Sequence, residues 1–253
     1  MSVFNQDKFL KQAIKSILSQ TFKDFEFLIL DDASIDESLT VIKSFKDKRI
    51  RLFTNKKRHG LAKGLNFLIS KARGDYLCRM DADDISIATR LKEQVEYLER
   101  YPQFVLVGSF AKIINEKGRT VGEFRYPTGY QEIRRVILSY NPFIHSSVMF
   151  RKKALEKIGR YDEDLFYSQD YDLFLRFVVK CPCANLAKFL LKFRWEPDFK
   201  KQKEQHWQGL KIKLKAIKEY GYSNWEIIKL IKPLFFYLVP SSIKKIYWHL
   251  RLS

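Results

Sequence analysis

The sequence is poor in cysteine and contains no long hydrophobic run. Its three cysteines, Cys78, Cys181 and Cys183, are too few for a disulfide framework, which fits a reduced, cytosolic setting. Cys181 and Cys183 have no second Cys/His pair at zinc spacing, so a structural role is favoured for them. No apolar run reaches the roughly 20 residues that cross a bilayer. The longest candidate, residues 227–239, is interrupted by two lysines and a proline. The start lacks the charged and then apolar order of a signal peptide, so none is expected.

Acidic residues are outnumbered. The 253 residues include 47 Lys and Arg against 29 Asp and Glu, a formal net charge of +18. This excess predicts an anionic partner, which could be phosphates, nucleic acid or an acidic membrane surface. Half of the excess lies in residues 199–253, where 12 Lys and Arg oppose three Glu. The sequence shows no internal repeat or low-complexity segment, and its apolar content of 46% can supply the core of one large domain.

Hydrophobic patterning alternates between short strands and amphipathic helices in the first hundred residues. Strands are expected at 25–30, 50–53 and 75–80, and helices at 7–20, 37–45, 61–72 and 89–100. This βαβα order predicts a mostly parallel sheet with helices on both faces. After Pro102 the texture changes. Shorter strands are expected at 104–110, 112–115, 146–150 and 186–195, and helices at 131–140 and 171–180.

Carboxylates stand where these strands end. Asp31 and Asp32 end the first strand, Asp81 and Asp83 follow the third, and Asp170 opens the last helix. Ligands bind at this edge of open α/β sheets. Hard oxygen ligands gathered there in so basic a chain suggest a divalent metal and a phosphorylated substrate. The alternative is that these acids only shape turns and favour helix N-termini.

Residues 199–253 are basic, aromatic and helical in pattern. Four apolar side chains are spaced for one helical face: Trp207, Leu210, Leu214 and Ile217. Segments 227–237 and 243–250 are also apolar and bordered by lysine. Such a tail suits contact with an anionic membrane surface, where lysines reach the headgroups. A helical hairpin packed on the main domain with a solvated basic face is the alternative.

Five motifs occur in a fixed order at the element boundaries. They read SVFN from position 2, SQTFKDFE from 19, DDAS from 31, MDADD from 80 and QDYDL from 169. Together they resemble the family 2 glycosyltransferases, inverting enzymes of the GT-A fold, over about residues 1–191. The resemblance implies an α/β domain at 1–198, with a nucleotide-binding half at 1–102 and an acceptor half at 103–198. Residues 199–253 would form a basic helical extension.

The resemblance also implies the chemistry. A hexose would pass from a nucleotide donor, usually a UDP-sugar, to a hydroxyl of a glycan or lipid-linked glycan, as in polysaccharide biosynthesis. Mn²⁺ or Mg²⁺ would bridge the donor diphosphate, with Asp83 as the best metal ligand and Asp81 in the metal shell or at the ribose. Asp170 matches the catalytic base. The enzyme is expected in the cytoplasm, held by its tail at the inner face of the membrane.

Three further residues are expected to bind the donor. The resemblance places Ser2 and Asp32 at the nucleobase, with Asp32 accepting from a ring N–H, and makes Lys63 a weaker candidate for the phosphates. The residue types agree with this chemistry. A hard cation offsets the charge of the leaving diphosphate, and a carboxylate on the far side of the sugar can take the acceptor proton. This geometry parallels that of inverting hydrolases.

The sequence departs from the family pattern in its first strand and beside the base. Few residues precede Phe4, so either the natural start lies upstream or the strand is clipped. Gln169 stands where a Glu is common, which should lower the pKa of Asp170 relative to a Glu-Asp pair. A catalytically silent GT-A-fold binding or scaffold protein therefore stays an alternative. A nucleotidyltransferase or a nucleic-acid-binding protein is less favoured, and no nucleic-acid module is recognisable.

Neighbouring residues leave part of the site open. Four other acids near Asp170 could take the role of base: Asp162, Glu163, Asp164 and Asp172. His145 precedes two serines and could line the acceptor side, but a hydrogen-bonded core histidine is the favoured interpretation.

Overall fold

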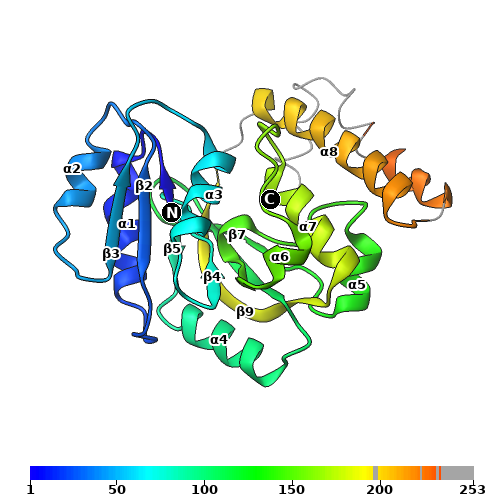
Figure 1. Cartoon of the computed structure of the whole chain (residues 1–253), viewed down its shortest axis with the longest axis horizontal. Helices are drawn as coiled ribbons and strands as arrows, with labels where there is room; N and C mark the ends of the chain where they lie inside the picture. The colour runs from blue at the N-terminus through cyan, green and yellow to red at the C-terminus, as the bar shows by residue number, and fades with distance from the viewer. Residues whose placement is uncertain (196–198, 223, 232–233, 235–253) are drawn as a thin grey trace.

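Two sheets form the centre of the protein. The computed structural model describes residues 1–195, 199–222, 224–231 and 234 (Figure 1). In the first sheet, three parallel strands pair in the order β1-β2-β3: β1 (Ser2–Val3), β2 (Phe27–Asp31) and β3 (Ile50–Thr54). Three helices flank it: α1 (Asp7–Leu18), α2 (Ser38–Lys43) and α3 (Leu61–Lys71). The amphipathic pattern of α1 places Leu10, Ala13 and Ile14 in a buried cluster with Val3 and Ile29.

The second sheet is mixed. Its strands run in the order β4-β8-β6-β9-β5, and β7 pairs with β6. Their bounds are β4 (Tyr76–Cys78), β5 (Ile85–Ser86), β6 (Leu106–Ile114), β7 (Thr120–Phe124), β8 (Met149–Arg151) and β9 (Cys183–Arg194). Only β6 and β9 are parallel neighbours in this sheet. The expected mostly parallel sheet is therefore wrong for this half, because short connections such as the turn between β6 and β7 favour antiparallel pairs.

Helices and loops surround the second sheet. They are α4 (Arg90–Arg100), α5 (Tyr130–Val136), the 3₁₀ turn η1 (His145–Ser147), α6 (Ala154–Ile158) and α7 (Gln169–Lys180). The strands expected at 104–110 and 112–115 are one strand, β6, with all but one of its residues buried. Burial on both faces removes the alternation that separates strands by pattern. A turn follows Asn115, with Gly118 at a φ of 75°.

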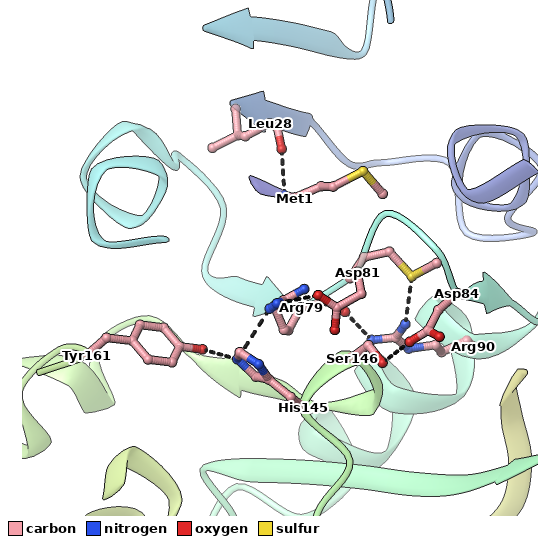
Figure 2. A network of polar contacts seen from close by, with 10 residues as sticks. Met1, Leu28, Arg79, Asp81, Asp84, Arg90, His145, Ser146 and Tyr161 are labelled. Atoms are coloured by element: carbon pink, nitrogen blue, oxygen red, sulfur yellow. Dashed lines mark hydrogen bonds and ion pairs between the residues drawn. The ribbon is translucent and has the colours of Figure 1, made fainter. Parts of the chain in front are cut away.

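A cavity of about 880 Å³ lies between the two sheets, lined by residues from β2, α3, β4 and α4. Strand β1 has only two residues, as its sequence predicts, and it does not pair with β4. The Met1 amino group donates to the Leu28 carbonyl at 2.8 Å, where a ladder amide would otherwise stand (Figure 2). Strand β4 is thus an edge strand of the second sheet and lies across the cavity from β2.

The C-terminal part begins with the long helix α8 (Phe199–Glu219), followed by the 3₁₀ segment η2 (Asn224–Leu230). Helix α8 lies against α7 (Figure 1). Leu210 and Ile217 join the core cluster there, whereas Trp207 and Leu214 are 41% and 43% exposed. The predicted apolar face thus divides between core and surface. Among the described residues, no helix has the length and apolarity to cross a membrane. Segment 243–250 lies outside the described residues, as does part of 227–237.

Candidate active site

The loop after β2 holds its second carboxylate with uncharged donors. The Asp32 carboxylate accepts from Asn55 Nδ2 at 2.7 Å and from the Gly60 amide at 2.8 Å, and the His59 amide donates to it as well. Asp32 is 2% exposed, so these bonds fix the turn that leads into α3. Asp31 is equally buried, and its Oδ1 has no hydrogen-bond partner among the described residues. This loop thus presents a buried acceptor at the strand edge.

The predicted donor residues Ser2 and Lys63 lie beside this turn. Ser2 is in β1, and a Cβ at Gly64 would stand 2.7 Å from the Ser2 Oγ. Gly64 therefore permits the close approach of α3 to β1. Lys63 is exposed in the first turn of α3, next to Gly64. The structure thus brings Ser2, Lys63 and the Asp32 loop to one edge of the first sheet.

The loop after β4 carries charge. Arg79 Nη2 donates to Asp81 Oδ1 at 2.6 Å, and the Arg79 side chain is 3% exposed (Figure 2). Arg79 Nη1 is buried without a hydrogen-bond partner among the described residues. Burial is the largest single effect on Asp81 and raises its pKa, but the charge and hydrogen bond of Arg79, together with smaller contributions from other groups, outweigh it, so the net pKa is lowered. The fully buried Arg90 fixes this loop by donating to the Arg79 carbonyl at 2.7 Å.

Asp83 and Asp84 both have raised pKa values but differ in their hydrogen bonds. Burial, followed by the charge of Asp81, raises the pKa of Asp83 to about 6. The same two causes, together with the charge of Asp83, raise the pKa of Asp84 well above its usual range. Asp84 is fully buried and accepts hydrogen bonds from the Ser146 hydroxyl and, at 2.7 Å, from the Arg194 amide (Figure 2). Asp84 therefore joins the loop to β9, whereas Asp83 keeps a carboxylate that no other described residue's hydrogen bond engages.

His145 belongs to the support of this loop. Its Nε2 lies 3.2 Å from Arg79 Nε, which donates to it, and 2.9 Å from the Tyr161 hydroxyl (Figure 2). Burial, and then the Arg79 charge, lowers the pKa of His145 well below its usual value. The ring is therefore neutral with Nε2 as acceptor. This arrangement confirms the interpretation of His145 as a hydrogen-bonded core histidine.

Asp170 is the second residue of α7 and faces the same site. Asn141 Nδ2 donates to its Oδ2 at 3.1 Å. Burial raises the pKa of Asp170, and the charges of Arg79 and Asp81 also act on it. These two interactions place Asp170 within electrostatic reach of the loop after β4. A half-buried carboxylate with a raised pKa is a good proton acceptor once it is ionised.

Three of the four neighbouring acids are engaged elsewhere, and the fourth, Asp164, is exposed. Asp172 forms an ion pair with Arg176 at 2.6 Å on the buried side of α7. Glu163 accepts from Asn66 Nδ2 at 2.9 Å, and Asp162 accepts from the Asp164 amide at 3.0 Å. Among these acids, Asp170 is therefore the one whose carboxylate is joined to the loop at 141 and acted on by the charges of the second carboxylate loop.

The donor set around Asp83 fits a hard divalent cation that also binds phosphates. The described residues contain no group of three or more His, Cys, Asp and Glu side chains arranged to hold a metal by themselves. Mg²⁺, however, typically uses one or two protein carboxylates with substrate phosphates and water. Asp81 and Asp83 would supply two such carboxylates. The raised pKa of Asp83 comes first from burial and then from the charge of Asp81, and a bound cation would offset both.

Comparison with known proteins identifies the chain. The sequence model described as Glycosyl transferase family 2 matches residues 1–159, well over half of the chain. The protein belongs to glycosyltransferase family 2. This glycosyltransferase is 34% identical over 263 residues to the uncharacterized glycosyltransferase MJ1057 of Methanocaldococcus jannaschii, covering 97% of this chain and 90% of that one. It is 33% identical over 202 residues to the O-antigen biosynthesis glycosyltransferase WbnJ of Escherichia coli, covering 77% of each chain.

Solved structures show that the family 2 enzyme has the GT-A fold. Residues 1–349 of S. aureus TarS, in complex with UDP-GlcNAc, align with a TM-score of 0.71 and 16% identity, over 92% of this chain and 70% of that one. The mannosyltransferase PcManGT from Pyrobaculum calidifontis, in complex with GDP-Man and Mn²⁺, aligns with a TM-score of 0.66 and 16% identity, over 94% and 68%. The fold and the glycosyltransferase activity expected from the motifs are thus confirmed.

Several residues of the enzyme's site were not found by sequence reasoning. Arg79, Tyr161, Asn141 and Arg194 each contact a predicted site residue or its support. Arg79 has a local signal, because it stands two positions before Asp81 near the end of a strand and so shares its face. The others come from loops and strands far away in the sequence, where no short-range pattern marks them.

Proposed function

We propose that this glycosyltransferase moves a sugar, with inversion, from a nucleoside diphosphate donor to a hydroxyl of a glycan or lipid-linked glycan. The observation that carries the proposal is that Asp170 lies within electrostatic reach of Arg79 and Asp81, at the loop after β4. The nucleotide sugars bound to TarS and PcManGT, and the O-antigen role of WbnJ, support this donor and acceptor. A UDP-sugar is the donor we favour.

The reaction is a single displacement. The acceptor oxygen forms a bond to the anomeric carbon as the bond from that carbon to the phosphate oxygen breaks, and the nucleoside diphosphate leaves with the bonding electrons. Asp170 takes the acceptor proton in the same step, a role that typically contributes about 10²–10⁴-fold. Attack opposite the leaving group inverts the anomeric centre.

The donor would lie along the first sheet. Asp32 and Ser2 contact the nucleobase in this proposal, and Lys63 reaches toward the phosphates from the first turn of α3. Asp83 and Asp81 would hold Mn²⁺ or Mg²⁺, which neutralises charge on the departing diphosphate when it is bound. Residues 1–102 then form the nucleotide-binding half, residues 103–198 the acceptor half, and residues 199–253 a separate tail.

The direct test measures release of nucleoside diphosphate from a panel of UDP- and GDP-sugars, with and without Mn²⁺ or Mg²⁺. We expect metal-dependent release that is lost in both Asp83→Ala and Asp170→Asn. The exposed Asp164→Asn, six residues before the base, is the matched control and should keep full activity. NMR of the product should show the anomeric configuration opposite to that of the donor.

Three outcomes would contradict the proposal. Release of pyrophosphate in place of a nucleoside diphosphate would indicate a nucleotidyltransferase. A retained anomeric configuration would exclude Asp170 as base of a single displacement. No turnover of any donor by a folded protein would favour the silent scaffold.

We also propose that the tail holds the enzyme at the cytoplasmic face of a membrane. Exposed apolar side chains gather in η2 and just beyond it: Ile227 at 55%, Ile228 and Ile231 at 62% each, and Leu234 at 44%. Lysines on α8 add positive charge beside them. Such a surface binds anionic lipid through apolar insertion and electrostatic attraction.

Vesicle flotation tests this contact. Full-length protein should float with phosphatidylserine-containing vesicles and not with neutral phosphatidylcholine vesicles, and Ile228→Asp should abolish flotation. Ile35→Asp is the control, because Ile35 is 91% exposed on the first half of the protein. Equal flotation of wild type and Ile228→Asp would exclude η2 as the membrane contact.

A further inference from the structure

The loop that carries Asp81 and Asp83 is held at both ends by arginines from other elements. At its start, Arg90 of α4 donates to the Arg79 carbonyl at 2.7 Å. At its end, Arg194 of β9 donates through Nε to the Asp83 carbonyl at 2.9 Å. Both arginines are buried, at 0% and 7% exposed. The backbone between these two carbonyls carries both proposed metal ligands, and it is therefore fixed by contacts that do not use their carboxylates.

Three further acceptors and an aromatic ring anchor the Arg194 guanidinium group. Nη1 donates to the carbonyls of Asn115 and Glu116, in the turn between β6 and β7, at 2.6 and 3.1 Å. Nη2 donates to Gln12 Oε1 at 3.2 Å, and the group lies 3.9 Å from the centre of the Phe9 ring in α1. An arginine suits this place because its planar fork donates to several acceptors in fixed directions. The guanidinium group is thus held by helix α1 and by the turn after β6.

The backbone of Arg194 binds the next acid of the same loop. Its amide donates to Asp84 Oδ1 at 2.7 Å, and the Ser146 hydroxyl donates to the other oxygen of that carboxylate. Arg194 therefore contacts two consecutive residues, Asp83 through its carbonyl and Asp84 through its carboxylate. The Asp83 carboxylate is engaged by no other described residue, so its position depends on the backbone that carries it.

Arg194 acts on Asp83 in two ways that an experiment can separate. Burial, and then the charge of Asp81, raises the pKa of Asp83, and the charge of Arg194 opposes them. The second effect is geometric, through the bond to the Asp83 carbonyl. A lysine would keep the charge, but its three donors share one nitrogen and cannot replace a fork that spans acceptors on three segments. Arg194→Lys therefore removes the geometric effect and keeps the charge.

We propose that Arg194 is a positioning residue for the divalent cation, because it holds the Asp83 backbone in the conformation from which the carboxylate binds. The inference rests on the proposed function, with Asp81 and Asp83 as ligands. Acids that repel one another move apart when their backbone is free, and a cation must then order them as it binds. Contacts that orient a metal ligand in advance typically change metal affinity by about ten- to a hundredfold.

Titration of the full chain with Mn²⁺, followed by electron paramagnetic resonance with UDP or GDP in fixed excess, tests the proposal without turnover. Arg194→Lys should weaken Mn²⁺ binding about ten- to a hundredfold, although the charge is kept. Gln12→Ala removes one anchoring acceptor and should weaken it about twofold, since a single neutral hydrogen bond is lost. Arg151→Lys is the matched control and should bind Mn²⁺ as wild type does. Arg151 also donates to backbone carbonyls, those of Phe104 and Leu98, which lie outside the loop after β4.

Unchanged Mn²⁺ affinity in Arg194→Lys would overturn the positioning role. So would an equal loss of affinity in Arg194→Lys and Arg151→Lys at equal stability in urea, because general packing would then explain it. If Arg194→Lys does not fold, Gln12→Ala takes its place, and wild-type affinity in that variant overturns the proposal.

The same titration separates this inference from the proposed function. A wild type that binds no Mn²⁺ with either nucleotide would refute the metal site and, with it, the role of Arg194. Weak Mn²⁺ binding confined to Arg194→Lys and Gln12→Ala, in a protein that turns over no donor sugar, would refute the proposed function and leave the positioning role standing.

Discussion

The two carboxylate loops of the site are built in opposite ways. After β2, Asp32 is held by neutral donors, two of them backbone amides. After β4, the acids Asp81, Asp83 and Asp84 lie close together beside two buried guanidinium groups, those of Arg79 and Arg90. In the first loop, hydrogen bonds from neutral donors fix the conformation of a turn. In the second loop, neighbouring acids repel one another, and among them only Asp81 forms an ion pair.

This difference says which loop a cation would alter. A cation changes little where a carboxylate is already satisfied by amides, but it relieves repulsion where acids are crowded. Substitutions in the first loop should therefore act mainly by removing hydrogen bonds from neutral donors. Substitutions of unpaired acids in the second loop should act mainly through their ionisation.

The largest effect on stability is expected at Arg79. Arg79→Leu removes the donor to the Asp81 carboxylate and to His145 Nε2. Because the Arg79 side chain is 3% exposed and that of Asp81 31%, the loss should lie between that of a surface pair and that of a fully buried pair, about 2–3 kcal/mol. Urea unfolding of the metal-free protein measures this. The control is Arg49→Leu, which breaks the pair with Asp47, whose side chains are 20% and 26% exposed, and should cost about 1 kcal/mol or less. Equal losses in the two variants would show that the second loop does not depend on its buried pair.

A smaller loss is expected at Asp32. Asp32→Ala strands the amides of His59 and Gly60 and the side chain of Asn55, which should cost about 2 kcal/mol. Urea unfolding at neutral pH measures the loss. Asp32→Asn keeps one acceptor oxygen and should recover part of the loss. Equal stability of Asp32→Ala and wild type would show that these hydrogen bonds do not hold the turn.

Replacing Asp83 should stabilise the folded protein, in contrast to the two preceding substitutions. Its folded pKa of about 6 lies above the roughly 3.9 of an unfolded Asp, so the folded protein binds the proton more tightly. Stability must therefore fall as pH rises through this window. Asp83→Asn removes the fall and should gain about 1–2 kcal/mol at about pH 8, with no gain at about pH 4. Urea unfolding in EDTA measures it, with Asp164→Asn as the exposed control. A loss of stability in Asp83→Asn at about pH 8 would show that ionised Asp83 does not destabilise the folded protein.

The smallest expected effect is a shift in a pH profile. Burial raises the pKa of Asp170, and the hydrogen bond from Asn141 favours its ionised form. Asn141→Ala should raise that pKa further, because the charged form loses a donor. The base must be ionised to act, so the acid limb of kcat/KM should move to higher pH by roughly half a unit. An unmoved acid limb with lower kcat would assign Asn141 to positioning alone.

The sequence predicts the site's carboxylates better than their partners. Asp32, Asp83 and Asp170 stand at element boundaries that hydrophobic periodicity reveals, and the structure brings Asp83 and Asp170 to one site while placing Asp32 at the neighbouring strand edge. Their partners come from distant positions: His145 lies 66 residues after Arg79. Such pairings depend on which strands become neighbours. The sequence does not reveal that β9 inserts beside β6, because burial on both faces hides strand order.

The two halves also differ in how well their helices and strands are predicted from the sequence. The helices of the first half are amphipathic and were predicted within a few residues of their bounds, as for α1 and α3. In the second half, the pattern divides β6 in two and does not predict β7 or α6, and in the first half it does not predict β5. The short elements there owe their form to tertiary contacts, so local propensity carries little information about them.

Helix α8 forms hydrogen bonds with two segments near Asp170, one at residues 167–168 and the other at Ser139. The Tyr167 amide donates to Gln208 Oε1 at 2.7 Å, the Ser168 hydroxyl donates to the Gln205 carbonyl, and Lys213 Nζ donates to the Ser139 carbonyl at 2.9 Å. Thermodynamic reciprocity follows from this geometry. Whatever binds the docked form of α8 more tightly than the undocked form also stabilises the loops around the base, and an acceptor that orders those loops strengthens that binding by the same factor. Helix α8 and the loops beside the proposed base thus form one packed unit.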